Sequence, residues 1–340
     1  MFSLDEIYQA HSLVQSVLPP TPQYVWPLLS QRLGIEVIVK HENHLPTGAF
    51  KVRGGLVYLD RLIRRKPAVR GVISATRGNH GQSIAYAARR VGLPATIVVP
   101  VGNSPDKNAA MRALGAELIE VGNDFDEARA ELGRLAEQRG YEPIPSFHRD
   151  LVIGVATYAL ELFTAQPDLD TVYVPIGLGS GICGLIRTRD LLGLKTTIVG
   201  VVSERAAAYA RSFEAGRAVT TPTAWTFADG IATRQPDGDA LEVILAGAAR
   251  VVEVSEREIA AAIRIFYDDI HNLAEGAGAA ALAGMIQDLP QHPERRCGVI
   301  LCGGNLDRHR AVEILAGGVP EVRPGESVDG ESGRQMLEMR

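Results

Sequence analysis

Short apolar runs alternate with amphipathic segments through much of the chain. The runs are brief and rich in β-branched residues, which is typical of buried strands. The segments between them carry apolar residues at helical spacing. In the first half, this pattern predicts strands at 72–75, 95–99 and 117–120, followed in turn by helices over 82–91, about 104–114 and 125–139. Strands that alternate with helices favour βαβ units and a parallel sheet.

The second half of the chain repeats this pattern. It predicts helices at 153–163 and 256–267, and strands at 171–175, 198–202, 251–254 and 297–301. Near the start, weak helical periodicity over 3–17 precedes a proline-rich stretch of extended chain. Together these elements predict an α/β protein with two open, twisted parallel sheets that carry helices on both faces.

One lysine stands at an unusual point in the pattern. The run 37–39 predicts a short buried strand, and the turn residues 46–48 are followed by apolar positions at helical spacing. Lys51 therefore lies near the N-terminus of a helix, where the dipole disfavours a cation and lowers the pKa of an amine. A neutral lysine amine is what Schiff-base chemistry requires. The competing interpretation is a solvated lysine on a helix face. This interpretation is the better one when the lysine is considered without the rest of the sequence.

Three glycine-rich loops follow predicted strands, at the edge where open α/β sheets bind ligands. In the first, Gly78 and Gly81 let the backbone approach a ligand, and Asn79 and His80 offer hydrogen bonds. An ordinary turn with an asparagine cap explains the same residues equally well. In the last, Cys302 is either a buried apolar residue or a weak hydrogen-bonding partner of a ligand.

The loop between these two, residues 175–184, indicates a phosphate site. It leaves a predicted strand and opens a helix, so its backbone N–H groups and the helix dipole suit an anion. Its alternating glycines and serine exceed what a tight turn requires. The pattern also resembles a dinucleotide fingerprint, and Glu204 follows it where a ribose-binding acid could lie. A nicotinamide cofactor is therefore a second interpretation.

Composition narrows the class of protein. With 340 residues, of which 46% are hydrophobic, the chain can form a substantial core and two domains. A net charge of -5 without a long basic run argues against nucleic acid and anionic membranes as partners. No apolar stretch is long enough to span a bilayer, and the start lacks a signal-peptide pattern. The 3 cysteines form neither a disulfide framework nor a zinc motif, so we expect a reduced, cytoplasmic protein.

Together these segments resemble one known family. The stretch 40–54 is similar to the lysine motif of fold-type II pyridoxal phosphate (PLP) enzymes, above all threonine/serine dehydratases and serine racemases. The loops 78–82, 177–184 and 302–305 occur in that family's order and approximate spacing, and the resemblance covers about residues 15–315. It implies a tryptophan synthase β-like fold with a large PLP-binding domain of residues 1–65 and 150–325, a small domain of residues 66–149 and a flexible tail at 326–340.

The resemblance also implies a role for each matched residue. Lys51 would carry pyridoxal 5′-phosphate through a Schiff base and act as the base at the substrate α-carbon, and Cys302 would face the pyridine nitrogen. Phe50 would pack beside the ring, Asn79 would hydrogen-bond its 3′-oxygen, and Glu275 would lie near the cofactor. The phosphate would be held by Gly177, Leu178, Gly179, Ser180 and Gly181, and the substrate carboxylate by Thr76, Gly78, Asn79 and His80, with Arg77 as a further candidate substrate-binding residue.

The implied activity is a dehydratase that converts a β-hydroxy α-amino acid, with threonine or serine as the first expectation, to a 2-oxo acid and ammonia. Phenylserine, 3-hydroxyaspartate and hydroxyectoine-derived hydroxy amino acids are alternative substrates. A racemase, a nicotinamide-dependent oxidoreductase and a non-catalytic PLP-binding protein are alternative functions. The resemblance further implies a homodimer or homotetramer, and no regulatory domain with isoleucine feedback beyond Arg340.

Two departures from the family pattern bear on function. Arg77 stands where serine racemases have a serine that acts as the second acid–base group, and because arginine stays protonated, racemisation is disfavoured. Arg77 would instead bind a substrate carboxylate or side chain, or form a surface ion pair. The family's divalent-cation site would involve Glu204 and Ala208, but Ala210 replaces its second acid, so we do not expect a metal there.

Overall fold

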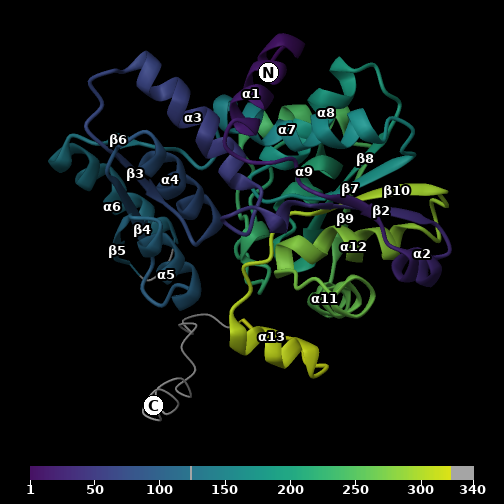
Figure 1. Cartoon of the computed structure of the whole chain (residues 1–340). Helices are drawn as coiled ribbons and strands as arrows, with labels where there is room; N and C mark the ends of the chain where they lie inside the picture. Colours follow the sequence, from purple (N-terminus) through teal and green to yellow (C-terminus); the bar gives the residue numbers. More distant parts are fainter. Residues whose placement is uncertain (123–124, 323–340) are drawn as a thin grey trace.

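The computed structural model describes residues 1–122 and 125–322 and has two lobes, each built on one sheet (Figure 1). The predicted tail at 326–340 lies outside the described residues. The larger sheet combines strands from both ends of the chain, whereas the smaller one is formed by strands between residues 72 and 143. The α/β class and the two sheets predicted from the sequence are therefore confirmed.

The larger sheet has six strands in the order β1, β2, β10, β7, β8, β9. All neighbours are parallel except β1 and β2, which pair antiparallel with Tyr24 opposite Val39. The antiparallel strand β1 at this edge was not predicted from the sequence, because it is too short to show a strand pattern. The strand bounds are β1 Gln23–Val25, β2 Glu36–His41, β7 Thr171–Pro175, β8 Thr197–Ser203, β9 Arg250–Val254 and β10 Arg296–Leu301.

The smaller sheet has four parallel strands in the order β5, β4, β3, β6. The helix after β3 begins earlier than predicted, because it follows Gly78 directly and the glycine loop is correspondingly short. Strand β6 was not predicted, since two residues show no periodicity. The bounds are β3 Val72–Ala75, β4 Ala95–Val99, β5 Glu117–Glu120 and β6 Glu142–Pro143, with α4 Asn79–Arg90, α5 Pro105–Ala113 and α6 Phe125–Arg139.

The remaining helices cover the larger sheet and join the two lobes. Helix α7 is longer than the predicted 153–163, because its polar first turn is capped by the His148 side chain. Among the described residues, no helix is long and apolar enough to cross a membrane. The bounds are α1 Leu4–Gln15, α2 Pro27–Leu33, α3 Lys51–Arg65, α7 Arg149–Ala165, α8 Ser180–Leu191, α9 Ala208–Ala215, α10 Gly238–Gly247, α11 Glu256–Ile270, α12 Gly276–Asp288 and α13 Arg308–Leu315, with 3-10 turns η1 Glu42–His44, η2 Glu204–Ala206 and η3 Asp229–Ile231.

Helix α3 lies between the lobes and packs on α4 of one and α7 of the other (Figure 1). The approach to α7 is close, since a Cβ on Gly54 would lie 2.8 Å from the carbonyl oxygen of Leu151. Just before α3, the backbone N–H of Phe50 donates to the carbonyl oxygen of Cys302 at 3.0 Å. The start of this helix therefore lies where the two lobes meet, beside the carboxyl end of β10.

Candidate active site

Lys51 is the first residue of α3, and two hydrogen bonds hold the backbone around it. Phe50 is tied to Cys302 beyond the end of β10, as described above. On the other side, the Ser83 hydroxyl of α4 donates to the Lys51 carbonyl oxygen at 2.6 Å. The lysine motif and the last glycine loop, which are far apart in the sequence, are therefore neighbours in space.

The Lys51 side chain is partly buried, and the pKa of its amine is lowered. Burial is the main cause, and interactions with Cys302, Glu275 and Asp229 counteract it only in part. No described residue accepts a hydrogen bond from the amine, which lies 4.6 Å from the centroid of the Phe50 ring. The lowered pKa agrees with the prediction from the sequence, but burial, rather than the helix dipole alone, accounts for the preference for the neutral amine.

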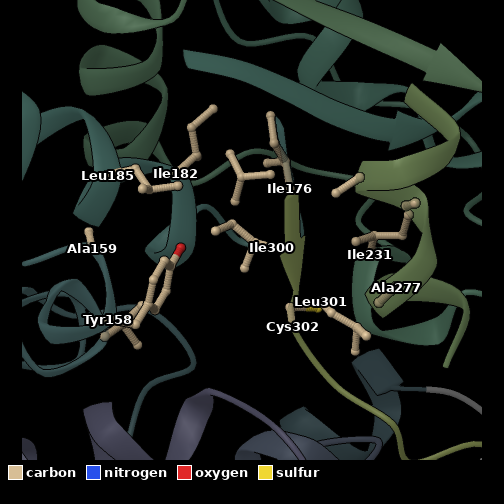
Figure 2. Packing of buried hydrophobic residues seen from close by; sticks show 14 of the residues in the cluster. Tyr158, Ala159, Ile176, Ile182, Leu185, Ile231, Ala277, Ile300, Leu301 and Cys302 are labelled. Carbon is tan, nitrogen blue, oxygen red and sulfur yellow. The ribbon is translucent and has the colours of Figure 1, made fainter. Parts of the chain in front are cut away.

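A pocket opens beside Lys51 at the carboxyl ends of β7 and β10. All the residues predicted to contact the cofactor line it, whereas of the predicted substrate residues 76–80 only Asn79 does. Figure 2 shows Cys302 at the end of β10, between Tyr158 on one side and Ala277 on the other. The complete lining is Phe50, Lys51, Asn79, Pro175, Gly177, Leu178, Gly179, Ser180, Gly181, Gly230, Ile231, Glu275, Ala277 and Cys302.

One wall of the pocket is the N-terminus of α8, which suits a phosphate. Gly179 precedes the helix with a φ of 99°, a left-handed conformation that other residues rarely adopt, and no side chain caps the helix. A Cβ on Gly177 would lie 2.5 Å from the carbonyl oxygen of Gly230, so a side chain has no space there. The uncapped N–H groups and the helix dipole form an anion site that fits the phosphate of PLP.

The polar groups around the pocket also fit this cofactor. Burial raises the pKa of the Cys302 thiol, so the thiol stays protonated and offers a neutral partner. Asn79 donates from Nδ2 to Oε1 of Glu275 at 2.6 Å and accepts from Nδ2 of Asn305 at 2.8 Å. Burial raises the pKa of Glu275, against the opposing charge of Lys107. A lysine whose amine pKa is lowered, a neutral thiol and an uncapped helix N-terminus lie around one pocket, and these groups suit PLP.

The loop 76–80 lies beside the pocket, and all of it is buried except Arg77. The Thr76 hydroxyl accepts a hydrogen bond from the Gly78 N–H at 3.0 Å. Burial and, to a lesser degree, the charge of Lys51 lower the pKa of His80 to about 3. Within the described chain, His80 Nε2 has no hydrogen-bond partner, and no residue pairs with the exposed Arg77. A neutral imidazole nitrogen and a guanidinium are therefore available to a ligand.

Lys107, which was not predicted from the sequence, reaches the same site from α5. Its Nζ lies 2.5 Å from Oδ2 of Asp229 and 3.4 Å from Oε2 of Glu275, and a Cβ on Gly78 would lie 2.5 Å from its Cδ. Burial alone would lower the pKa of Lys107, but the two carboxylates raise it well above its usual range. The signal that pointed to Lys51, a lysine in the first turn of a helix, applies equally to Lys107 and could have found it.

The residues at the family's divalent-cation position do not form a suitable ligand set. Glu204 is exposed in η2, and Ala208 begins α9 with Ala210 in its first turn. Over residues 1–122 and 125–322, no group of three or more histidine, cysteine or acidic side chains could hold a metal ion. A single exposed carboxylate is a poor site for a hard cation.

Residues 14–303 match the family model of the pyridoxal-phosphate dependent enzymes. The chain belongs to this family. It is 34% identical over 85% of its length to the biosynthetic L-threonine dehydratase of Salmonella typhimurium, and it spans 57% of that protein. It is 33% identical over 96% of its length to the L-threonine ammonia-lyase of Thermotoga maritima, spanning 81% of it. The L-threo-3-hydroxyaspartate ammonia-lyase of a Pseudomonas species is 32% identical over 93% of this chain and 99% of its own.

Solved structures of other family members share the fold. A pyridoxal 5′-phosphate-dependent aspartate racemase aligns with a TM-score of 0.86 and 28% identity, covering 91% of this chain and 97% of its own. Threonine deaminase isoform 2 of Solanum lycopersicum aligns with a TM-score of 0.85 and 30% identity, covering 93% and 95%. The family, its fold and its cofactor, all expected from the resemblance, are confirmed, and a nicotinamide cofactor is set aside.

Proposed function

We propose that this enzyme is an ammonia-lyase that removes water and then ammonia from a β-hydroxy α-amino acid, with L-threonine or L-serine as substrate. The observation that carries the proposal is the partly buried Lys51, the pKa of whose amine is lowered, at a pocket walled by the N-terminus of α8. The threonine dehydratase and the threonine ammonia-lyase among the relatives support this substrate class.

When bound, PLP would supply the electron sink that makes the α-proton of the substrate acidic. The residues of the chain then have three tasks. The N-terminus of α8 anchors the phosphate, the loop 76–80 orients the substrate carboxylate, and the neutral amine of Lys51 takes the α-proton. Because the Cys302 thiol stays protonated, it offers the pyridine nitrogen a neutral partner, and such surroundings favour rapid β-elimination.

The overall reaction needs no oxidant or reductant. The α-carbon loses a proton to Lys51, and the β-hydroxyl gains a proton and leaves as water. The dehydrated product then exchanges its nitrogen for the oxygen of a water molecule, which releases one 2-oxo acid and one ammonia.

The test is a panel of β-hydroxy amino acids incubated with the purified PLP-loaded protein and scored for 2-oxo acid and ammonia. We expect L-threonine and L-serine to give both products in equal amounts, and Lys51→Ala to give neither. Phenylserine and 3-hydroxyaspartate are the competing substrates. A yellow protein that releases no ammonia from any member of the panel would contradict the proposal and favour a non-catalytic PLP-binding protein.

A second candidate substrate is 3-hydroxyaspartate, which Arg77 favours. This exposed guanidinium has no described partner and belongs to the loop that we assign to the substrate carboxylate. A guanidinium suits a second carboxylate, and one relative is named an L-threo-3-hydroxyaspartate ammonia-lyase. If 3-hydroxyaspartate is the substrate, Arg77→Gln lowers kcat/KM for 3-hydroxyaspartate at least tenfold more than it lowers kcat/KM for L-threonine. An unchanged ratio of the two rates rejects it.

Arg77 also disfavours racemisation. A racemase needs a second acid–base group, and the Arg77 guanidinium stays protonated. We predict that the enzyme does not interconvert the enantiomers of serine. Chiral chromatography of the serine left after partial reaction is the check, and efficient interconversion would contradict this interpretation of Arg77.

A further inference from the structure

A buried ionic cluster lies behind the segment that carries Lys51, and the proposed reaction does not use it. Arg53, two residues after Lys51, is fully buried. Its guanidinium donates to both carboxylate oxygens of Glu42, at 2.8 and 3.0 Å, and to both of Glu161, at 2.7 and 2.9 Å. A further hydrogen bond of 3.1 Å reaches the Thr157 hydroxyl. Paired contacts on two sides leave this planar group a single orientation.

The cluster is balanced in charge. Lys40 of β2 is also fully buried and donates to Oε2 of Glu161 at 2.6 Å, so Arg53 and Lys40 together face two carboxylates. Burial alone would raise the pKa of Glu161, but the His11 ring nitrogen 3.7 Å away, the hydrogen bonds from Arg53 and the nearby positive charges hold it well below its usual range. The cluster therefore joins β2, η1, α3 and α7 through charged groups that cannot be separated cheaply.

The first turn of α3 has no local means of keeping its place. Its N-cap residue, Phe50, makes no capping hydrogen bond with its side chain, and the turn contains no acidic residue. It instead begins with Lys51, at the end where the helix dipole disfavours a cation. Arg53, the third residue of the helix, connects this turn to Glu42, which precedes the loop 45–50, and to α7. In place of a cap, the tertiary contacts of Arg53 hold this turn, together with the hydrogen bonds from Phe50 to Cys302 and from Ser83 to Lys51.

We propose that Arg53 is a positioning residue for Lys51: its paired contacts with Glu42 and Glu161 fix the first turn of α3, and with it the direction in which the Lys51 amine enters the pocket. The inference rests on the proposed role of Lys51. The position of the Lys51 amine must be exact, since a displacement of about 1 Å at a reacting group can lower a rate by roughly 100-fold. Lysine at position 53 would keep the charge but could not reproduce the paired contacts.

The test compares Arg53→Lys and Glu42→Gln with the wild-type enzyme. Glu42→Gln keeps the shape of the cluster, but its amide can accept only one of the two hydrogen bonds from Arg53. The control is Arg250→Met, which breaks the ion pair between Arg250 and Asp288 at the opposite end of α12 from the pocket. For each protein we would measure the melting temperature, kcat and KM for the best substrate of the panel, and the pH titration of the colour of bound PLP.

We expect both cluster variants, as folded proteins, to lower kcat at least tenfold, to change KM less than threefold and to shift the pH midpoint of the colour. The Arg250→Met control should lower the melting temperature and keep kcat within twofold of the wild type. The inference is overturned if a folded cluster variant keeps the wild-type kcat and titration, or if kcat follows the melting temperature in all three variants.

Recovery of neither cluster variant as a folded protein would also overturn the inference, because Arg53 would then serve the fold alone. The proposed function fails separately. If the wild-type protein binds no PLP, or yields no 2-oxo acid from any substrate, that failure is seen before the variants are compared.

Discussion

Lys107→Met is the substitution that tests the connection between the lobes at the pocket. Lys107 belongs to α5 beside the small sheet, and its amine pairs with Asp229 and Glu275 of the other lobe. At the start of the same helix, the Ser104 hydroxyl donates to Asp307 at 2.5 Å across the same boundary. The substitution removes the ionic contact, keeps most of the apolar stem and leaves the Ser104 hydrogen bond in place.

The surroundings of Lys107 set the size of the effect. Removing one partner of a buried ion pair costs about 3–5 kcal/mol, because the other charge is left unpaired. Asp229 keeps 24% of its side-chain surface exposed, and Glu275 can take up a proton since burial already raises its pKa. The expected effect is ~2–3 kcal/mol, which is roughly a 30- to 150-fold change in the equilibrium constant for holding α5 against Asp229 and Glu275. Apparent substrate affinity falls with the fraction of molecules in which these contacts are made.

Steady-state kinetics on the best substrate of the panel measures this effect. We expect Lys107→Met to raise KM at least tenfold with a smaller change in kcat, and the added Asp229→Asn substitution to recover part of the loss. The control is Lys66→Met, which removes a 2.7 Å ion pair with Glu142 from a side chain that is 57% exposed, so KM should stay within twofold. A KM of Lys107→Met within twofold of wild type, or an equal rise in the control, would refute the reasoning.

Three further predictions concern the cofactor site and the buried cluster. Gly177→Ala should weaken PLP binding at least tenfold in a fluorescence titration, because its methyl group would lie 2.5 Å from the carbonyl oxygen of Gly230. The control is Gly133→Ala, where a Cβ meets open space, and it should leave the affinity for PLP unchanged. In the PLP-free protein, Lys51 should react with an amine-selective reagent with a pH midpoint below the pKa of an ordinary lysine, which is ~10.4. Peptide mass spectrometry measures this midpoint, and a value at or above ~10.4 would contradict the lowered pKa of Lys51. Because the pKa of Glu161 is lowered on folding, its stabilising effect is present above about pH 4.3 and is lost as the pH falls. The free energy of unfolding in urea should therefore differ between wild type and Glu161→Gln by a steady amount above about pH 5 and by a smaller amount below about pH 4. A constant difference at all pH values would contradict the lowered pKa of Glu161.

The strands that could be predicted from the sequence are those with enough apolar residues to show a pattern. Five-residue runs such as 95–99 are buried and regular, so periodicity finds them. Strand β1 and strand β6 have too few residues for any periodicity, and partner strands from distant parts of the chain determine their pairing. The antiparallel edge at β1 depends on that pairing, and no local signal specifies it.

The residues of the candidate site also fall into two groups, those with a local signal in the sequence and those without one. Lys51, Gly179 and Cys302 each follow a strand or open a helix, so their positions carry a local signal that could be predicted. The ion pairs of Lys107 arise only when the two lobes meet, and its partners lie far away in the sequence. The hydrogen bonds of Arg53 have the same origin, because the sequence shows the motif but not the carboxylates that surround it.

The central claim, that Lys51 holds the cofactor, is tested most directly by trapping the bond. Reduction of the PLP-loaded protein with borohydride, followed by digestion and mass spectrometry, identifies the modified lysine. We predict one phosphopyridoxyl group on the peptide that contains Lys51, and none at that position in Lys51→Ala. A label on Lys107, a buried lysine beside the pocket, or no label at all would contradict the account.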